Sequence, residues 1–269
     1  MRVVAKIVIV PLLLLLAVGL QPAPGHSPRS MAGLGDSITR AVACCGPGEQ
    51  LAQSWSTGLS RSEGLRSHYQ RLLAMHPGIS GNNTNNARSG ATVADLPRQA
   101  EAAVAQKAEY VTVLIGANDL CTSSASAMTS PADFEASVMS ALAILQQNLP
   151  RSRIFVSSIP DIYQLWSALK QDDSARQRWA TANTCQSLLS ESNTEADRQL
   201  VVQREVAFNE VLARACSRFA NCRWDGGVVY RYKFSVSEVS TMDYFHPSLH
   251  GQKSLAELTW KASFWASGR

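Results

Sequence analysis

The apolar run Tyr110–Ile115 is the segment that most restricts how this chain can fold. It is continuous rather than alternating, it is rich in β-branched residues, and Gly116 follows it directly. A short run of this kind is typical of a parallel strand that is buried on both faces of its sheet. Such a strand needs helices on both sides, so the run predicts an α/β domain.

Similar runs recur along the chain and alternate with helical segments. Met31–Gly35 and Ile154–Val156 are predicted as further strands, and Val228–Val229 as a weak last strand. The predicted helices cover residues 93–107, 131–149, most of 161–218, and 255–264. This alternation implies right-handed β-α-β units and a mostly parallel sheet. The length suits one such domain, and no repeat or linker divides it, so residues 31–269 are predicted to form a single domain.

The first thirty residues have the features of an export signal. Arg2 and Lys6 precede the apolar stretch Ile7–Leu20. This stretch is shorter than the ~20 residues that a membrane-spanning helix needs and fits the ~7–15 of a secretory signal. An uncleaved signal anchor is the alternative. We expect residues 1–30 to be a signal peptide and a disordered segment leading into the domain. The protein is then secreted, with no stable membrane span after cleavage.

Beyond this leader the chain is almost neutral. Of the 25 Lys and Arg residues, Arg2, Lys6 and Arg29 lie in the first thirty, which leaves 22 basic against 21 acidic residues. This balance gives no electrostatic basis for binding nucleic acid. We expect no nucleic-acid partner and favour a monomer.

An even number of cysteines in an exported chain indicates disulfides. The six are Cys44, Cys45, Cys121, Cys185, Cys216 and Cys222. Cys216 and Cys222 bracket a short polar turn, and Cys121 could then pair with Cys185. The neighbours Cys44 and Cys45 remain, and a bridge between them would be strained and uncommon. No Cys-x-x-Cys or His-rich spacing accompanies these residues, so we expect no metal site.

Four short polar blocks follow predicted segments: Gly35-Asp36-Ser37, Arg88-Ser89-Gly90, Gly116-Ala117-Asn118-Asp119 and Asp243-Tyr244-Phe245-His246. A hydroxyl nucleophile needs a base, and the base needs an orienting carboxylate. Asp243 and His246 can converge within one turn, and Ser37 follows a strand at the edge where ligands bind in α/β sheets. The alternatives are a helix cap at Ser37 and an ordinary Asp–His hydrogen bond in a loop.

The other histidines fit a base less well. His68 and His76 flank a helix without a nearby polar partner, and His250 has no carboxylate three residues ahead. For an oxyanion, Asn118 offers a side-chain amide and Gly90 an unobstructed backbone N–H. Alternatively, Asn118 caps a helix and Gly90 supplies a positive-φ turn. No Gly-x-Ser-x-Gly sequence is present, which disfavours a serine nucleophile of the α/β-hydrolase type.

In order and spacing the four blocks resemble those of the SGNH hydrolases, also called the GDSL esterase/lipase family, over about Met31 to Gly251. The resemblance implies a flavodoxin-like three-layer α/β/α sandwich. It implies that Ser37 is the nucleophile, His246 the base and Asp243 its orienting acid. It also implies an oxyanion hole made by the Ser37 N–H, the Gly90 N–H and the Asn118 side chain. Ile38 replaces the leucine of many members, a same-size exchange.

The resemblance and the remaining residues indicate the substrate less directly. Ser54-Trp55-Ser56-Thr57-Gly58 is similar to the secreted phospholipase-B-like branch of that family. Four side chains are predicted to line an acyl pocket, namely Trp55, Tyr163, Leu165 and Trp166; the alternative is that they only pack a helix against the sheet. We expect a cofactor-free ester hydrolase acting on lipids or other apolar acyl substrates. A carbohydrate esterase removing acetyl groups from glycans, or a non-catalytic secreted binding protein, are the other interpretations.

Overall fold

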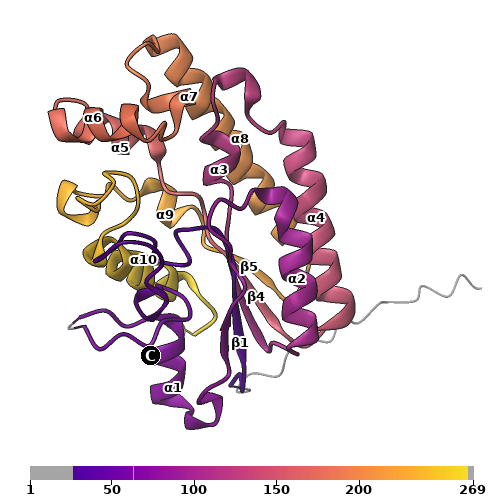
Figure 1. Cartoon of the computed structure of the whole chain (residues 1–269). Coiled ribbons are helices and arrows are strands. Elements are labelled where there is room, and N and C mark those ends of the chain that lie inside the picture. The colour runs from indigo at the N-terminus through magenta and orange to yellow at the C-terminus, as the bar shows by residue number, and fades with distance from the viewer. Residues whose placement is uncertain (1–26, 63, 266–269) are drawn as a thin grey trace, which may run out of the picture.

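The computed structural model of the chain describes residues 27–62 and 64–265 (Figure 1). The predicted signal peptide lies outside the described residues, and only residues 27–30 of the predicted leader are inside them. Two of these four residues are hydrogen bonded to the domain: the Arg29 N–H donates to Glu109 Oε2 (2.8 Å), and the Tyr110 N–H donates to the Ser30 carbonyl (3.1 Å). This end of the segment that we expected to be disordered is therefore ordered.

Within the described residues, five parallel strands form one sheet in the order β2-β1-β3-β4-β5, which is the flavodoxin-like order. The strands are β1 (Met31–Gly35), β2 (Asn83–Asn85), β3 (Tyr110–Leu114), β4 (Arg153–Val156) and β5 (Cys222–Trp224). The prediction of a last strand at Val228–Val229 is wrong. These two residues begin the short helix α9 (Val228–Arg231), and β5 lies upstream, where it pairs with β4.

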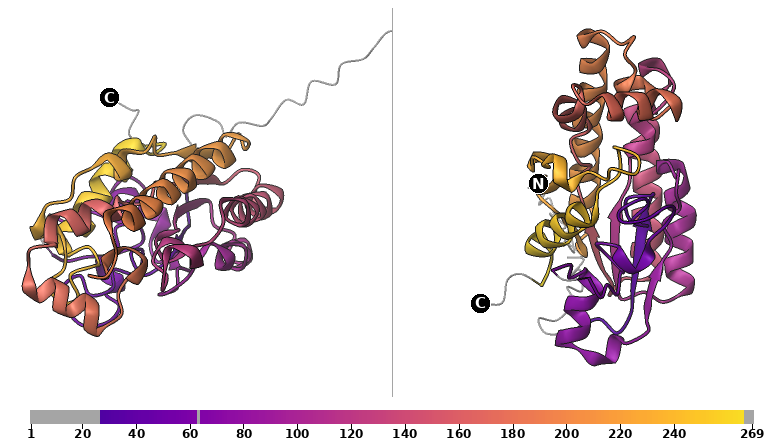
Figure 2. Two further views of the ribbon diagram at one scale, coloured as in Figure 1. Left: turned by 90° about the horizontal axis from the view of Figure 1, so that it is seen from above. Right: turned by 60° about the vertical axis from the view of Figure 1, so that its left-hand side comes forward.

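Helices cover both faces of the sheet and give the predicted three layers (Figures 1 and 2). On one face lie α2 (Leu96–Ala105), α4 (Pro131–Asn148) and α8 (Glu195–Ser217); on the other lie α1 (His68–Met75) and α10 (Leu249–Ala262). Hydroxyl side chains cap the ends of several of these helices, as helix N-termini require. Ser130 accepts from the Asp133 N–H, with Pro131 in the first turn, and Thr194 forms a capping box with Asp197.

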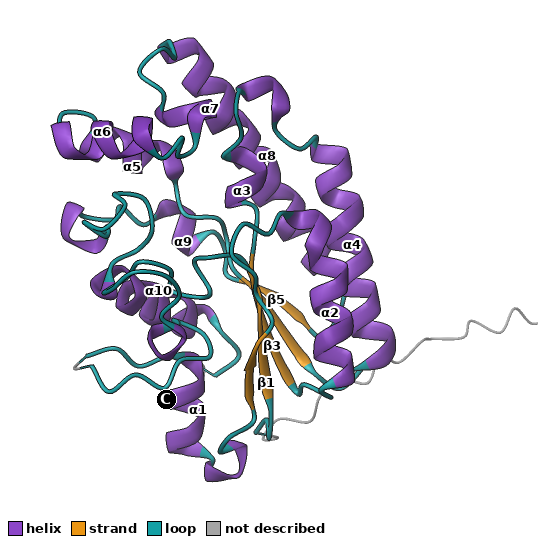
Figure 3. Cartoon of the chain, viewed as in Figure 1, coloured by secondary structure: helices purple, strands orange, loops and turns teal. Residues whose placement is uncertain are grey.

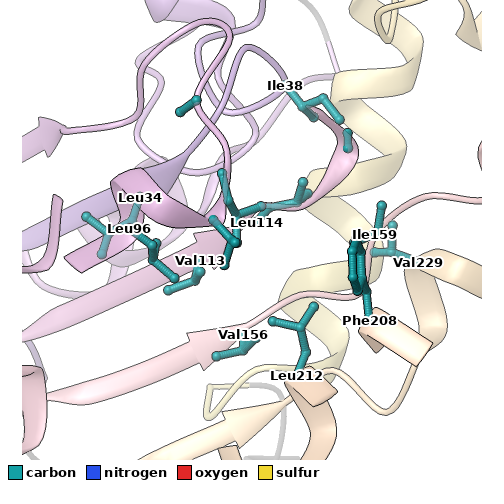
Figure 4. Close-up of a cluster of buried hydrophobic side chains, with 14 of the residues drawn as sticks. Leu34, Ile38, Leu96, Val113, Leu114, Val156, Ile159, Phe208, Leu212 and Val229 are labelled. Carbon is teal, nitrogen blue, oxygen red and sulfur yellow. The ribbon is translucent and has the colours of Figure 1, made fainter. Parts of the chain in front are cut away.

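The sheet is buried on both faces because alternate side chains of each strand enter different cores. In β3, Tyr110 packs with Met31 and Phe155 in a small cluster beside α1, whereas Val111 and Val113 belong to the main core. Figure 4 shows that main core, where Leu34, Val113 and Val156 of three strands meet side chains that include Leu96 of α2 and Phe208 of α8. The continuous apolar run that predicted β3 is therefore explained by two cores rather than one.

The first part of the long connection between β4 and β5 lies beyond the carboxyl ends of the strands (Figure 3). Before α8 it forms α5 (Ile162–Leu169), α6 (Asp173–Thr181) and α7 (Gln186–Leu189), and it faces the short α3 (Ala117–Leu120). Short 3-10 helices occupy Leu51–Gln53, Pro77–Ile79, Val93–Asp95, Ala125–Ala127 and Val236–Glu238. No helix of residues 27–62 and 64–265 has both the length and the apolar character needed to cross a membrane.

Two of the predicted cysteine pairs are disulfides. Cys121 is bonded to Cys185, which ties the end of α3 to the start of α7, and Cys216 is bonded to Cys222. Cys44 and Cys45 are free thiols whose sulfur atoms lie 3.0 Å apart.

Candidate active site

Gly35 is the residue that lets β1 end beside β3 and turn into the loop that carries Ser37. Its φ is +145°, and a Cβ at this position would lie 2.1 Å from the Leu114 carbonyl oxygen, so a residue with a side chain does not fit. The buried Gln99 side chain of α2 holds this turn, because it accepts from the Gly35 N–H (2.7 Å) and donates to the Gly35 carbonyl (2.9 Å).

Ser37, His246 and Asp243 form one continuous chain of hydrogen bonds. His246 Nε2 lies 2.7 Å from Ser37 Oγ, and His246 Nδ1 lies 2.6 Å from Asp243 Oδ2. Asp243 Oδ1 also accepts from the backbone N–H groups of Phe245 and His246, both at 3.0 Å. Burial alone would raise the pKa of Asp243, but the His246 hydrogen bond and these backbone donors outweigh it, and the pKa lies below its ordinary value. The carboxylate therefore stays ionised and keeps the ring oriented.

The loop that carries Asp243 and His246 is held on several sides. The Ser240 N–H donates to the His246 carbonyl (2.9 Å), and the Leu249 N–H donates to the Cys44 carbonyl (3.0 Å) in the loop after Ser37. Tyr244, between the two functional residues, has a φ of +55°, and its carbonyl accepts from the Trp179 indole N–H of α6 (2.9 Å). A left-handed residue at this position costs energy, and these contacts hold it in place.

Hydrogen bonds join the segments that carry the three predicted oxyanion donors. The Asn118 amide donates to the Ala91 carbonyl (2.9 Å), next to Gly90, and the Arg88 N–H donates to the Gly35 carbonyl (3.1 Å). An amide has two N–H donors. The second N–H of Asn118 and the backbone N–H groups of Ser37 and Gly90 have no acceptor among the described residues. Gly90 has a φ of +78°, so the turn that sequence reasoning offered as the alternative is present together with the free donor.

A polar network joins the loop after Ser37 to the loop of Gly90. The Arg40 guanidinium donates to the Ala87 carbonyl (2.8 Å) and to Glu49 Oε2 (2.5 Å). Glu49 Oε1 accepts from the Ser89 hydroxyl (2.7 Å). The pKa of Glu49 is lowered, first by its hydrogen bond from Arg40. This network was not anticipated from the sequence, in which nothing marks Arg40 and Glu49 as partners.

Two buried acids next to predicted site residues accept hydrogen bonds within the loops. Asp36 accepts from the Ile38 N–H (2.9 Å), and burial raises its pKa to about 7. Asp119 accepts from the Val93 N–H (2.9 Å) and from the Thr129 hydroxyl (2.8 Å), and burial raises its pKa to about 6. Both pKa values reflect the cost of a charge with little solvent around it.

A pocket adjoins His246 and is lined mostly by apolar side chains. They come from the segments that follow β1, β3, β4 and α9 and from the His246 loop, and they include Ile38, Ala117, Ile162, Leu165, Phe234, Val239 and Phe245. Asp161, Gln164 and Glu238 are polar members of its wall. Of the four predicted acyl-pocket residues, Leu165 lines this pocket. The adjacency of Phe245 to His246 was the signal that could have identified a further lining residue.

The prediction that Trp55 closes the acyl pocket is wrong. Its side chain is fully buried and packs edge-on against His68, with ring centroids 5.4 Å apart. The statement that His68 lacks a polar partner is also wrong, since its ring nitrogens lie 2.8 Å from the Tyr110 hydroxyl and 2.9 Å from the Thr259 hydroxyl. Burial lowers the pKa of His68 to about 3, so it is a neutral core residue.

Tyr163 and Trp166, on α5, do not line the pocket beside His246. The Tyr163 hydroxyl donates to Glu195 (2.8 Å), and its ring packs against Trp166, which lines a different cavity. Among the described residues, no group of three or more His, Cys, Asp or Glu side chains could hold a metal ion.

Comparison with known proteins bears on the fold and the family of the chain. A search of curated protein sequences found no match. Solved structures share the fold at low identity. A candidate GDSL-like lipase from Parabacteroides merdae is 16% identical, with a TM-score of 0.50 over 87% of this chain and 94% of that one. A family two carbohydrate esterase from Clostridium thermocellum is 15% identical, with a TM-score of 0.50 over 87% and 63%.

A third solved structure is the salicylyl-acyltransferase SsfX3 from a tetracycline biosynthetic pathway, at 14% identity and a TM-score of 0.52 over 89% of this chain and 55% of that one. At these identities the structures show the fold alone. The sequence itself carries the stronger result, because residues 31–259 match the family described as GDSL-like lipase/acylhydrolase. That span contains all four polar blocks and most of the described domain, and the chain therefore belongs to the GDSL-like lipase/acylhydrolase family.

Proposed function

We propose that the protein is a secreted serine hydrolase that cleaves carboxylic esters of lipids or other apolar acyl groups through an acyl-enzyme. Its family makes it an ester hydrolase; the nucleophile, the acyl preference and the location are the proposal. The observation that carries it is the hydrogen-bond chain from Asp243 through His246 to Ser37, at the edge of a largely apolar pocket.

In the first half-reaction, Ser37 Oγ attacks the ester carbonyl and His246 Nε2 takes the serine proton. Asp243, held ionised by its donors, fixes the tautomer with the proton on Nδ1 and stabilises the imidazolium. The negative oxygen of the tetrahedral intermediate accepts from the N–H groups of Ser37 and Gly90 and from the free N–H of Asn118. His246 then protonates the leaving alcohol, and the acyl group remains on Ser37.

In the second half-reaction, His246 Nε2 removes a proton from water, which attacks the acyl-serine carbonyl. The same donors stabilise the second tetrahedral intermediate, and the proton returns to Ser37 as the carboxylic acid leaves. The pocket wall of Ile38, Leu165 and Phe245 supports an apolar acyl group, because burying such a group there removes apolar surface from water.

Two disulfides support an oxidising location and hence secretion. The polar wall residues Asp161, Gln164 and Glu238 support a second candidate function, the removal of short acyl groups from glycans, since they place hydrogen-bonding groups in the same pocket.

A substrate panel with a Ser37→Ala control tests the proposal. Nitrophenyl esters of increasing acyl length, phospholipids, triglycerides and acetylated xylan are compared side by side. We expect turnover of apolar esters that the Ser37→Ala variant lacks, with a loss on the order of 10⁴–10⁶ in kcat and an almost unchanged melting temperature. Retained activity in that variant would exclude Ser37 as the nucleophile. Activity confined to acetylated xylan and acetyl esters would select the glycan esterase instead.

A further inference from the structure

A second cavity also has α5 in its wall. Leu165 of α5 lines the pocket beside His246, whereas its neighbour Trp166 lines the second cavity. The charged and aromatic side chains of the cavity wall are Trp166, Lys170, Arg176, Trp179, Glu191 and Arg198. Three of these are cationic and one is a carboxylate, so the wall carries an excess of positive charge.

Arg198 is a buried cation that forms no ion pair with any described residue. Its side chain comes from α8, the residue is 7% exposed, and its guanidinium donates to the carbonyls of Leu188 (3.1 Å), Ser190 (2.9 Å) and Asn193 (2.6 Å). Among the described residues, no carboxylate lies within ion-pair distance of it. Carbonyl groups satisfy its hydrogen bonds, but carboxylates such as Glu195 and Asp197 balance its charge only from beyond ion-pair distance, and a buried charge of this kind favours an anion beside it.

The other two cations of the wall, Lys170 and Arg176, also have N–H groups that a bound anion could use. Lys170 Nζ lies 4.5 Å and the Arg198 guanidinium carbon 4.3 Å from the centre of the Trp166 ring, so the indole holds both cations in place. Arg176 forms an ion pair with Asp173 and a longer one with Glu191 (3.7 Å). Its buried Nε is the atom that faces Glu191 in this longer pair, and it has no acceptor within hydrogen-bond distance in the described part of the chain.

Acidic residues near the cavity have partners of their own. Glu195, on the first turn of α8, accepts from the Tyr163 hydroxyl (2.8 Å) and from Gln199 (2.7 Å). Asp197 accepts from the hydroxyl and the N–H of Thr194. Both carboxylates contribute to local neutrality, but neither lines the cavity.

We propose that this cavity binds an anionic phosphate group, either free phosphate or the phosphate of a phosphate ester. A phosphate presents several acceptor oxygens and a charge of more than one, which suits an ammonium beside two guanidinium groups. A hydrogen bond connects the cavity wall to the loop of the proposed base, because Trp179 of the wall donates to the carbonyl of Tyr244, which lies between Asp243 and His246.

Calorimetric titration of the full-length protein with inorganic phosphate tests the site without any turnover. Lys170→Met and Arg176→Met keep the aliphatic stems and remove the charges. We expect saturable binding by the wild type that each variant weakens by about tenfold, the effect of losing one charge-assisted hydrogen bond. Arg178→Met is the matched control, since Arg178 is exposed on the same helix and does not line the cavity. The absence of saturable phosphate binding, or an equal loss in Arg178→Met, would refute the site.

Kinetics then identify the source of the phosphate. An acyl glycerol phosphate is compared with the acyl glycerol of the same chain length, and the ratio of kcat/KM values is measured for the wild type and for Lys170→Met. If the preference for the acyl glycerol phosphate falls in Lys170→Met, the phosphate that the cavity binds belongs to the substrate. If the preference is unchanged while phosphate binding is lost, the cavity binds a separate anion. The titration is repeated in the Ser37→Ala background, so failure of the proposed catalytic role leaves the binding result readable.

Discussion

The Cys121–Cys185 disulfide should stabilise the protein about twice as much as Cys216–Cys222. The cysteines of the first pair are 64 residues apart in sequence and those of the second are 6 apart. A crosslink removes conformational entropy from the unfolded chain, and the entropy removed increases with the logarithm of the number of residues in the loop that it closes. At 25 °C this relation gives about 4 kcal/mol for the longer loop and about 2 kcal/mol for the shorter one.

Urea unfolding of two double variants measures the difference. Cys121→Ala with Cys185→Ala should lose about 2 kcal/mol more unfolding free energy than Cys216→Ala with Cys222→Ala. Only the first variant should also lose kcat, because Cys121 ends the short helix that carries Asn118. Equal losses of stability, or a larger loss for the short loop, would refute the reasoning from loop length.

Three further predictions concern the loops around Ser37. Burial raises the pKa of Asp36 from 3.8 to about 7, so the folded state loses stability as pH rises through that window. In urea titrations the unfolding free energy of Asp36→Asn should therefore increase relative to that of the wild type between about pH 4 and about pH 8, and a difference that does not change with pH would contradict the raised pKa. Glu49 accepts from Ser89, the neighbour of Gly90, so Glu49→Gln should displace the Gly90 N–H; ester assays should show kcat lowered by about tenfold with KM little changed, because an oxyanion donor acts only in the transition state. Arg88→Gln breaks the exposed ion pair with Asp95 in the same loop and should leave both constants unchanged. Gly35→Ala should cost more than ~3 kcal/mol in thermal unfolding, and a melting temperature near that of the wild type would show that β1 can move away from Leu114.

The residues around Ser37 could be predicted because local sequence determines much of their placement. Asp243 and His246 are close in the chain, and each remaining block follows a strand, so parallel strands bring them to one edge. The run that became β3 was readable because two cores require apolar side chains on both of its faces. The order of the strands was not readable residue by residue and came with the family resemblance.

The failures share a physical cause, which is that the deciding contacts are distant in sequence. Trp55 was predicted to face a ligand, but His68 gives its ring a buried neighbour, and His68 in turn bonds to β3 and α10. β5 is a short edge strand with one basic residue, Arg223, and lacks the β-branched run that identifies a central strand. Val228 and Val229 are β-branched residues of the kind favoured in strands, but they lie in the single helical turn of α9.

The attachment of the β4–β5 connection has a consequence for protein engineering. Residues between these strands supply one wall of the pocket beside His246 and the whole lining of the second cavity, while the five strands and Ser37 lie outside that connection. Exchanging the connection for that of a relative should change selectivity without rebuilding the sheet. A successful chimaera must retain a tryptophan at position 179 and a cysteine at position 185, because the bonds of these two residues to Tyr244 and Cys121 fix the exchanged segment on the rest of the domain.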